Sequence, residues 1–269
     1  MSARPVIGFI GLGSQGGPMA ERILDADFNL MVWARRPEAL EPFVAKGART
    51  SPSVEELGAG CDQVCVCVVD DAGVAQICDQ LIPAMQPGSC LVIHSTILPE
   101  SCVALAKDCA AKGIGFLDAP VSGGGPAAAA GKLTVMCGGD ADSFARCEPV
   151  FASFAGLTVH LGEAGSGQRA KIVNNSLMAA SMGLAHAAMQ AAGGLDIDRA
   201  AFAELVKGSS GRSFGFETYA RLPEPSVFAH GAALLAKDVD LLKSTLPGDD
   251  GAELLRTTAM TFLDAARGE

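Results

Sequence analysis

The sequence predicts an α/β domain with a doubly wound, largely parallel sheet, followed by an all-α domain. Up to Gly162, short runs rich in β-branched residues alternate with stretches of helical periodicity. This alternation is typical of a parallel sheet that helices cover on both faces. After Gly162 the patterns are helical, with no convincing strand. The 269 residues are enough for two domains, which we expect to span residues 1–162 and 163–269.

The individual elements are expected where the hydrophobic period changes along the chain. Strands are expected at residues 6–10, 29–33, 63–69, 90–94, 115–118, 132–137 and 157–160. Between the early strands, helices are expected at residues 17–25, 38–46, 54–59, 72–82 and 98–112. The second part should form helices at residues 168–192, 199–207, 213–222, 228–246 and 251–266. The first of these is apolar nearly all round, which predicts burial on several sides.

The composition argues against several kinds of partner. The net charge is −10 and no cluster of lysine or arginine interrupts it, so nucleic acid is not expected to bind. Residues 176–195 contain no Asp, Glu, Lys or Arg, but they are mostly Ala, Ser and Gly and too weakly apolar for a membrane span. Residues 1–5 lead straight into a strand, which leaves no room for a signal peptide and favours a cytoplasmic location.

The nine cysteines do not form a disulfide pattern. Their number is odd, and Cys65 and Cys67 lie within an apolar run. Cys61, Cys65 and Cys67 lack the spacing of zinc ligands and have no histidine nearby, so no metal is expected. We expect buried, reduced thiols, as is usual in a reducing compartment.

A glycine-rich motif follows the first expected strand. Its residues Gly11, Leu12, Gly13, Ser14, Gln15 and Gly16 match G-x-G-x-x-G and open a helix, which is the context that a dinucleotide-binding turn requires. Gly11 makes the tight turn, Gly13 lets the backbone approach a pyrophosphate, and Gly16 lets the helix pack closely. The motif predicts a Rossmann-type dinucleotide site; a structural turn without a ligand is the alternative.

The end of the second expected strand favours NADP(H) over NAD. NAD enzymes usually place an acidic residue there, which binds the ribose 2′-hydroxyl. This chain has Ala34, Arg35 and Arg36, and its first acid, Glu38, follows the arginines. Guanidinium groups suit a 2′-phosphate because they form paired charge-assisted hydrogen bonds. The alternative is that Arg35 and Arg36 are solvated surface charges.

Residues 118–125, with the sequence Asp-Ala-Pro-Val-Ser-Gly-Gly-Gly, end a strand with consecutive glycines. Exposed amides in such a turn can bind an anion, and the hydroxyl of Ser122 adds a donor. A carboxylate is the anion that we expect this segment to bind. A flexible turn is the alternative.

Residues 165–175 place polar groups at the start of an apolar helix. Lys171 and Asn175 are four apart and share one helix face, which should point inward. An unpaired buried ammonium is costly, and desolvation moves a lysine towards the pKa that proton transfer requires. The alternative is a structural lysine paired with a carboxylate such as Asp118 or Asp238.

Taken in order, four segments resemble the motifs of the β-hydroxyacid dehydrogenase family, which includes 3-hydroxyisobutyrate dehydrogenase, tartronate semialdehyde reductase and 6-phosphogluconate dehydrogenase. They are residues 8–19 (Gly-Phe-Ile-Gly-Leu-Gly-Ser-Gln-Gly-Gly-Pro-Met), residues 118–124, residues 165–175 (Gly-x-Gly-x-x-x-Lys-x-x-Asn-Asn) and the pair Lys237 and Asp238. The likeness runs from residue 6 to about residue 242.

The resemblance implies a role for each matching residue. Lys171 would be the general acid/base, and Asn175 would orient the substrate. The remaining implied positions are Ser122, Gly123 and Gly124 for the substrate carboxylate, Lys237 to complete the pocket, Val69 and Thr96 at the nicotinamide, and Arg35 at the 2′-phosphate. From spacing alone, Lys237 could equally face solvent, as charged residues at helical spacing usually do.

The implied activity is hydride transfer between NADP(H) and a small β-hydroxy acid or its semialdehyde. Met178 lies where phosphogluconate enzymes carry a second acid, which argues against that substrate. Two alternatives stay open. One is an imine or aldehyde reductase on the same scaffold, although imine-reducing relatives usually replace the lysine by Asp or Tyr. The other is a non-catalytic cofactor-binding scaffold, and some relatives of that type lack the lysine.

A homodimer or homotetramer is expected, because the helix after Lys171 has the character of a buried helix.

Overall fold

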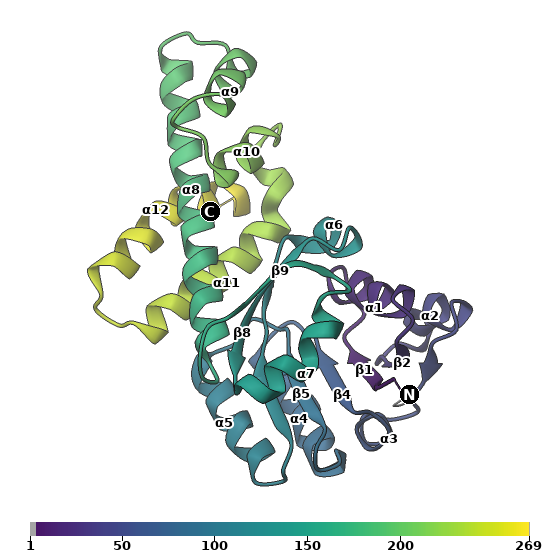
Figure 1. The fold of residues 1–269 in the computed structure, drawn as a ribbon. Coiled ribbons are helices and arrows are strands. Elements are labelled where there is room, and N and C mark those ends of the chain that lie inside the picture. The colour runs from purple at the N-terminus through teal and green to yellow at the C-terminus, as the bar shows by residue number, and fades with distance from the viewer. Residues whose placement is uncertain (1–3, 269) are drawn as a thin grey trace. The chain divides into compact units, whose positions relative to one another are not determined.

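The computed structural model of the protein describes residues 4–268, so the first three residues of the leading segment 1–5 lie outside the described part. Contacts divide the chain into two units, Met1–Lys171 and Ile172–Glu269. The first unit is an α/β sheet domain and the second is helical, as the sequence predicts (Figure 1).

The main part of the sheet is parallel, in the order β3-β2-β1-β4-β5-β6. The bounds are Val6–Ile10 for β1, Asn29–Trp33 for β2, Arg49–Thr50 for β3, Gln63–Val66 for β4, Cys90–Ile93 for β5 and Gly115–Asp118 for β6. Strands β2 and β3 follow one another on one side of β1, and β4 then pairs with β1 on its other side. Ligands of doubly wound sheets bind at the carboxyl ends of the strands where the order reverses in this way.

Beyond β6 the sheet becomes mixed. Strand β8 (Leu133–Gly139) is antiparallel to β6 and to β7 (Val121–Ser122), and parallel to β9 (Ala155–His160). The sequence has consecutive glycines after the strand expected at 115–118, and its pattern does not predict the elements that the structure forms there. After β6 the chain makes the short strand β7 and then the helix α6 (Gly124–Ala129).

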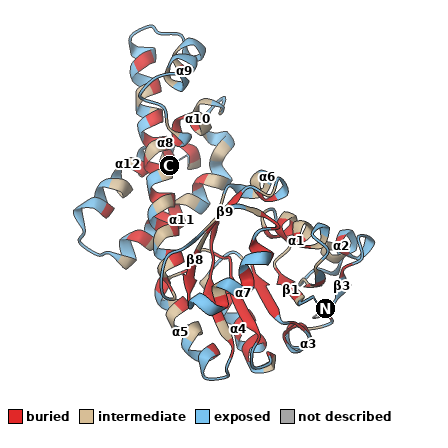
Figure 2. Cartoon of the chain, viewed as in Figure 1, coloured by how far each residue is buried: buried red, intermediate tan, exposed pale blue. Residues whose placement is uncertain are grey.

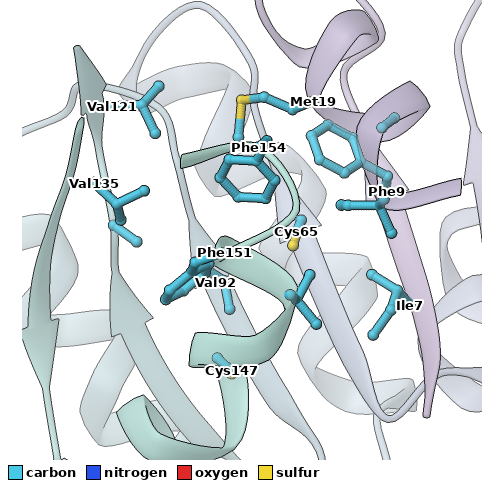
Figure 3. Packing of buried hydrophobic residues seen from close by; sticks show 14 of the residues in the cluster. Ile7, Phe9, Met19, Cys65, Val92, Val121, Val135, Cys147, Phe151 and Phe154 are labelled. Carbon is cyan, nitrogen blue, oxygen red and sulfur yellow. The ribbon is translucent and has the colours of Figure 1, made fainter. Parts of the chain in front are cut away.

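Helices cover both faces of the sheet. On one face, α1 (Gly16–Asp25) and α7 (Ala141–Phe151) pack against β1 and β5, and Figure 3 shows Phe9, Met19, Phe151 and Phe154 in this layer. On the other face lie α3 (Val54–Gly60), α4 (Asp71–Ala84) and α5 (Pro99–Ala110). The central strands are buried (Figure 2). Because helices cover both of their faces, their sequences are nearly continuous apolar runs.

Several boundaries differ from the prediction for local reasons. The helix expected at 38–46 is a 3₁₀ turn (Pro37–Leu40) followed by α2 (Glu41–Ala45), with Pro42 in the first turn, where its missing N–H costs nothing. The strand expected at 63–69 ends at Val66, and the N–H of Val68 donates instead to Ser95 Oγ at 2.8 Å. Helix α7 was not predicted, although Asp140 caps it by accepting from the N–H of Ser143.

The second unit is built from helices. Their bounds are Ser166–Gly194 for α8, which begins in the first unit, Arg199–Lys207 for α9, Phe214–Ala220 for α10, Ala229–Thr245 for α11 and Asp250–Arg267 for α12. Met182, Phe216 and Phe262 belong to its core. A Cβ on Gly183 would overlap the carbonyl oxygen of Thr258, so α8 and α12 cross at very short distance. Among residues 4–268, no helix combines the length and hydropathy that crossing a bilayer requires.

All nine cysteines are buried or half-buried. Burial raises the pKa of several of these thiols to about 12, namely those of Cys61, Cys65, Cys67, Cys78 and Cys109. Thiols with such a pKa are almost entirely protonated at neutral pH.

Candidate active site

The glycine loop between β1 and α1 contains two kinds of glycine. Gly11 has a φ of +100°, and a Cβ there would overlap the carbonyl oxygen of Cys67. A Cβ on Gly16 would overlap the carbonyl oxygen of Gly11. Around Gly13, by contrast, nothing in the described chain beyond its own neighbours lies within 4 Å of a Cβ. The fold itself requires Gly11 and Gly16, whereas the open space at Gly13 fits a ligand that approaches the backbone.

The loop and the start of α1 suit an anion. The N-cap residue Gln15 makes no side-chain hydrogen bond to the helix, and the first turn carries no acidic residue. Positive helix charge and backbone amides therefore face the loop without a competing carboxylate. Leu12 and Ser14 lie in the same turn between β1 and α1. The residues present fit the pyrophosphate of a dinucleotide.

A cavity extends from this loop to the carboxyl end of β2. It is lined by Gly11, Leu12, Gly13, Trp33, Ala34, Arg35, Arg36, Ala39 and Gln76, among others. Arg35 and Arg36 are exposed, and within residues 4–268 neither has a salt-bridge partner. Both arginines therefore line the same cavity as the glycine loop.

The two residues predicted at the nicotinamide follow neighbouring strands. Val69 lies after β4 and is exposed, and Thr96 lies after β5 and is half-buried. Both strands end at the same edge of the sheet as β1. This is the edge at which the glycine loop lies.

The predicted carboxylate-binding segment packs on the glycine loop. Ser122 pairs with Thr134 in the β7–β8 ladder, and Gly123 and Gly124 have φ values of +129° and +71°. A Cβ on Gly125 would lie only 2.5 Å from the carbonyl oxygen of Ser14. The structure thus places side by side the two segments that were separately predicted to bind anions.

Lys171 and Asn175 lie one turn apart on α8 and are buried, with exposed fractions of 8% and 9%. Gln168, which the sequence analysis did not single out, is also buried. The spacing of these three residues places them on one face of the helix. This face is a polar stripe on an otherwise mainly apolar helix.

Asp118, a potential partner of Lys171 in the sequence analysis, anchors the start of α8. Its Oδ1 accepts a hydrogen bond from the N–H of Gly165 at 2.6 Å, and its Oδ2 accepts one from the N–H of Gln168 at 2.8 Å. A Cβ on Gly138 would lie 2.6 Å from Oδ1, and one on Gly167 would lie 2.9 Å from Oδ2. Glycines at these positions make room for the carboxylate, which ties α8 to β6.

The Asp118 carboxyl should produce a pH-dependent stability. Burial raises its pKa from 3.8 to about 6, against the lowering effect of the amides of Gly165 and Gln168. The folded state then binds the proton more tightly than the unfolded state. This contribution to the free energy of unfolding is therefore full below about pH 4 and is lost as the pH rises through about 6.

Urea unfolding at pH 5 and pH 7.5 measures this effect. The difference in unfolding free energy between the wild type and Asp118→Asn should be about 1 kcal/mol larger, in favour of the wild type, at pH 5 than at pH 7.5. An equal difference at the two pH values would contradict the raised pKa.

In the second unit, Asn175 and Lys237 both contact one carboxylate. The Nδ2 of Asn175 donates to Asp238 Oδ2 at 2.6 Å, and the Nζ of Lys237 lies 3.5 Å from Asp238 Oδ1. Asp238 is itself buried. This carboxylate fixes the orientation of the Asn175 amide. Lys237 is thus partly buried beside an acid, rather than fully exposed on the helix.

The sheet order, the open glycine turn and the cavity beside it fit the class of oxidoreductases that use a nicotinamide dinucleotide. Two family models agree. The NAD-binding domain of 6-phosphogluconate dehydrogenase matches residues 6–162, and the NAD-binding domain of NADP-dependent 3-hydroxyisobutyrate dehydrogenase matches residues 165–267. The chain belongs to the β-hydroxyacid dehydrogenase family, which confirms the resemblance found in the sequence.

Individual relatives agree with this assignment. The chain is 36% identical to the NAD-dependent L-serine dehydrogenase of Pseudomonas aeruginosa, covering 95% of this chain and 90% of that protein. It is 31% identical to the mitochondrial 3-hydroxyisobutyrate dehydrogenase of Homo sapiens, covering 96% and 81%. The structure of the Mycobacterium tuberculosis 3-hydroxyisobutyrate dehydrogenase with L-serine aligns with a TM-score of 0.85 at 27% identity, covering 98% and 96%.

Proposed function

We propose that the protein transfers hydride between NADP(H) and a small β-hydroxy acid or its semialdehyde, with Lys171 as the general acid/base. The observation that carries the proposal is the burial of Lys171 beside Asn175 on the polar stripe of α8. A buried amine on this face has a favourable environment for moving a proton to or from a substrate oxygen.

Each proposed residue has a distinct task. In oxidation, the neutral amine of Lys171 takes the proton from the substrate hydroxyl; in reduction, its ammonium protonates the forming alkoxide and stabilises the charge. Ser122 and the amides of Gly123 and Gly124 hold the carboxylate, and Asn175 orients the substrate, with Lys237 as a further substrate contact. A nicotinamide dinucleotide, when bound, would supply the hydride-transfer chemistry. Gly11, Leu12, Gly13, Ser14, Gln15, Val69 and Thr96 would contact this cofactor.

The preference for NADP(H) is supported by Arg35 and Arg36 at the cavity wall, without a salt-bridge partner among the described residues. A 2′-phosphate would supply that partner. Names alone point to both cofactors: the Pseudomonas aeruginosa enzyme is named as NAD-dependent, whereas the matching family model is described by an NADP-dependent 3-hydroxyisobutyrate dehydrogenase. The arginines therefore decide the preference in this proposal.

Arg35→Glu should lower NADPH affinity by roughly 10- to 100-fold while leaving NADH affinity unchanged or improved, because a charge-assisted pair with the 2′-phosphate is lost and repulsion is added. Fluorescence titration with NADPH and NADH measures both affinities. Arg49→Glu, the same charge reversal on the exposed strand β3, is the matched control and should change neither. Equal losses for the two cofactors would refute the 2′-phosphate role.

The substrate class is tested by direct turnover. The purified protein, with NADP⁺ or NAD⁺, is assayed with 3-hydroxyisobutyrate, glycerate, serine, threonate and 4-hydroxybutyrate, and with NADPH against the matching semialdehydes. We expect turnover of at least one hydroxy acid, faster with NADP⁺ than with NAD⁺. Absence of turnover across the panel would contradict the proposed activity.

A further inference from the structure

The side chain of Gln168 holds the backbone on both sides of Thr96. Gln168 is fully buried, with an exposed fraction of 0%. Its Oε1 accepts a hydrogen bond from the N–H of Ile97 at 3.2 Å, and its Nε2 donates to the carbonyl oxygen of Ser95 at 2.8 Å. One carboxamide therefore satisfies a donor and an acceptor of the same short segment, as a neighbouring strand would.

The same network reaches the other strand ends. The hydroxyl of Ser95 accepts the hydrogen bond from the N–H of Val68, next to Val69. The backbone N–H of Gln168 donates to Asp118 at the end of β6. The first turn of α8 is thus joined to the segments that follow β4 and β5 and to the last residue of β6.

We infer that Gln168 is a positioning residue that sets Lys171 against the nicotinamide-lining segment at Thr96. The inference rests on the proposed function, because it takes Lys171 as the acid/base and Thr96 as part of the nicotinamide site. Lys171 follows Gln168 by three residues and lies on the same helix face. Hydrogen bonds from position 168 to both sides of Thr96 restrain the rotation and the translation of α8 at that turn.

The approach of α8 to the sheet is built into neighbouring residues. A Cβ on Gly167 would overlap the carbonyl oxygen of Met136 and lie 2.7 Å from the carbonyl oxygen of Asp118. Only a glycine lets the helix start come this close. At this depth the side chain must both donate and accept while staying uncharged, and glutamine has the length and the two functions that the site needs.

Such a restraint matters to the rate rather than to binding. The acid/base and the hydride carrier must be aligned at the same time, and a displacement of about 1 Å lowers the rate by about 100-fold. A positioning residue should therefore affect kcat and the pH and isotope dependence of the chemical step. Substrate KM and cofactor affinity should change little.

The test compares Gln168→Met, which keeps the length and loses both hydrogen bonds, with Gln80→Met. Gln80 is exposed on α4 and its side chain donates to the carbonyl oxygen of Gln76 in its own helix, so it is the matched control. Gln168→Asn, one methylene shorter, serves if the methionine variant does not fold. For each we measure kcat, KM, NADPH affinity and the deuterium isotope effect on hydride transfer.

We expect kcat of the position 168 variant to fall at least about tenfold with a larger isotope effect, while KM and NADPH affinity stay within about threefold. Gln80→Met should match the wild type. The inference is overturned if kcat is retained, if the loss lies in KM or NADPH affinity, or if thermal stability falls with no change in the isotope effect.

A second measurement separates this inference from the proposed function. If the wild type turns over no hydroxy acid, the function fails, and the restraint is judged by amide hydrogen exchange instead. The N–H of Ile97 should exchange at least about tenfold faster in Gln168→Met than in the wild type or Gln80→Met, because it loses its acceptor. Unchanged exchange overturns the inference.

Discussion

Lys171→Ala should lower turnover by several hundredfold or more, which is about 3 to 4 kcal/mol of transition-state stabilisation. The alanine variant has no group at this position that can take or give the hydroxyl proton. NADPH affinity should stay within about twofold of the wild type, because the cofactor contacts proposed above lie elsewhere in the first unit. Steady-state kinetics and NADPH fluorescence titration measure the two quantities.

Two controls make this result specific. Lys112→Ala removes an exposed lysine of the same unit and should leave turnover unchanged. Small primary amines added to Lys171→Ala should restore part of the rate, since they supply the missing base. If Lys171→Ala retained wild-type turnover, the acid/base role would be wrong even if NADPH still bound.

Gly11→Ala should lower the stability of the fold, whereas Gly13→Ala should weaken cofactor binding. Gly11→Ala should lower the free energy of unfolding by about 3 kcal/mol or more, because the methyl group meets the Cys67 carbonyl and the φ of +100° strains an L-residue. Gly13→Ala should leave stability nearly unchanged, since open space surrounds its Cβ. It should nevertheless weaken NADPH binding by at least about tenfold, because the methyl group occupies the space proposed for the pyrophosphate.

Urea unfolding and NADPH titration on both variants test this pair. Each variant is the control of the other, since both add the same methyl group to the same loop. Normal NADPH affinity in Gly13→Ala would show that the open space is not where the pyrophosphate binds.

The parts of the fold that the sequence predicts best are those with the strongest periodicity. The predicted bounds of β1, β2, β6 and α9 match the structure, because burial on both faces or regular amphipathic spacing leaves a clear pattern. The short β7 and the helix α7 were missed. A strand of two residues has no period to read, and Pro149 within α7 interrupts a helical pattern whose cap at Asp140 was visible.

The candidate site could be predicted only as far as its local motifs reach. The glycine loop, Ser122, Lys171 and Asn175 stand in recognisable patterns along the chain. The hydrogen bond from Gln168 to Ser95 joins residues 73 positions apart, so no local sequence pattern predicts it. The fit of Asp118 between Gly138 and Gly167 is likewise a property of three segments in space. Its carboxylate was considered as a partner for lysine, and the structure adds that it accepts hydrogen bonds from the backbone at the start of α8.

The burial of the cysteines has a chemical consequence for an enzyme of this family. Oxidation of sulfur proceeds through the thiolate, and burial raises the pKa of the Cys61, Cys65 and Cys67 thiols to about 12, so these side chains hold almost no thiolate at neutral pH. Peroxide and disulfide reagents, which react with the thiolate, should therefore modify these buried cysteines slowly.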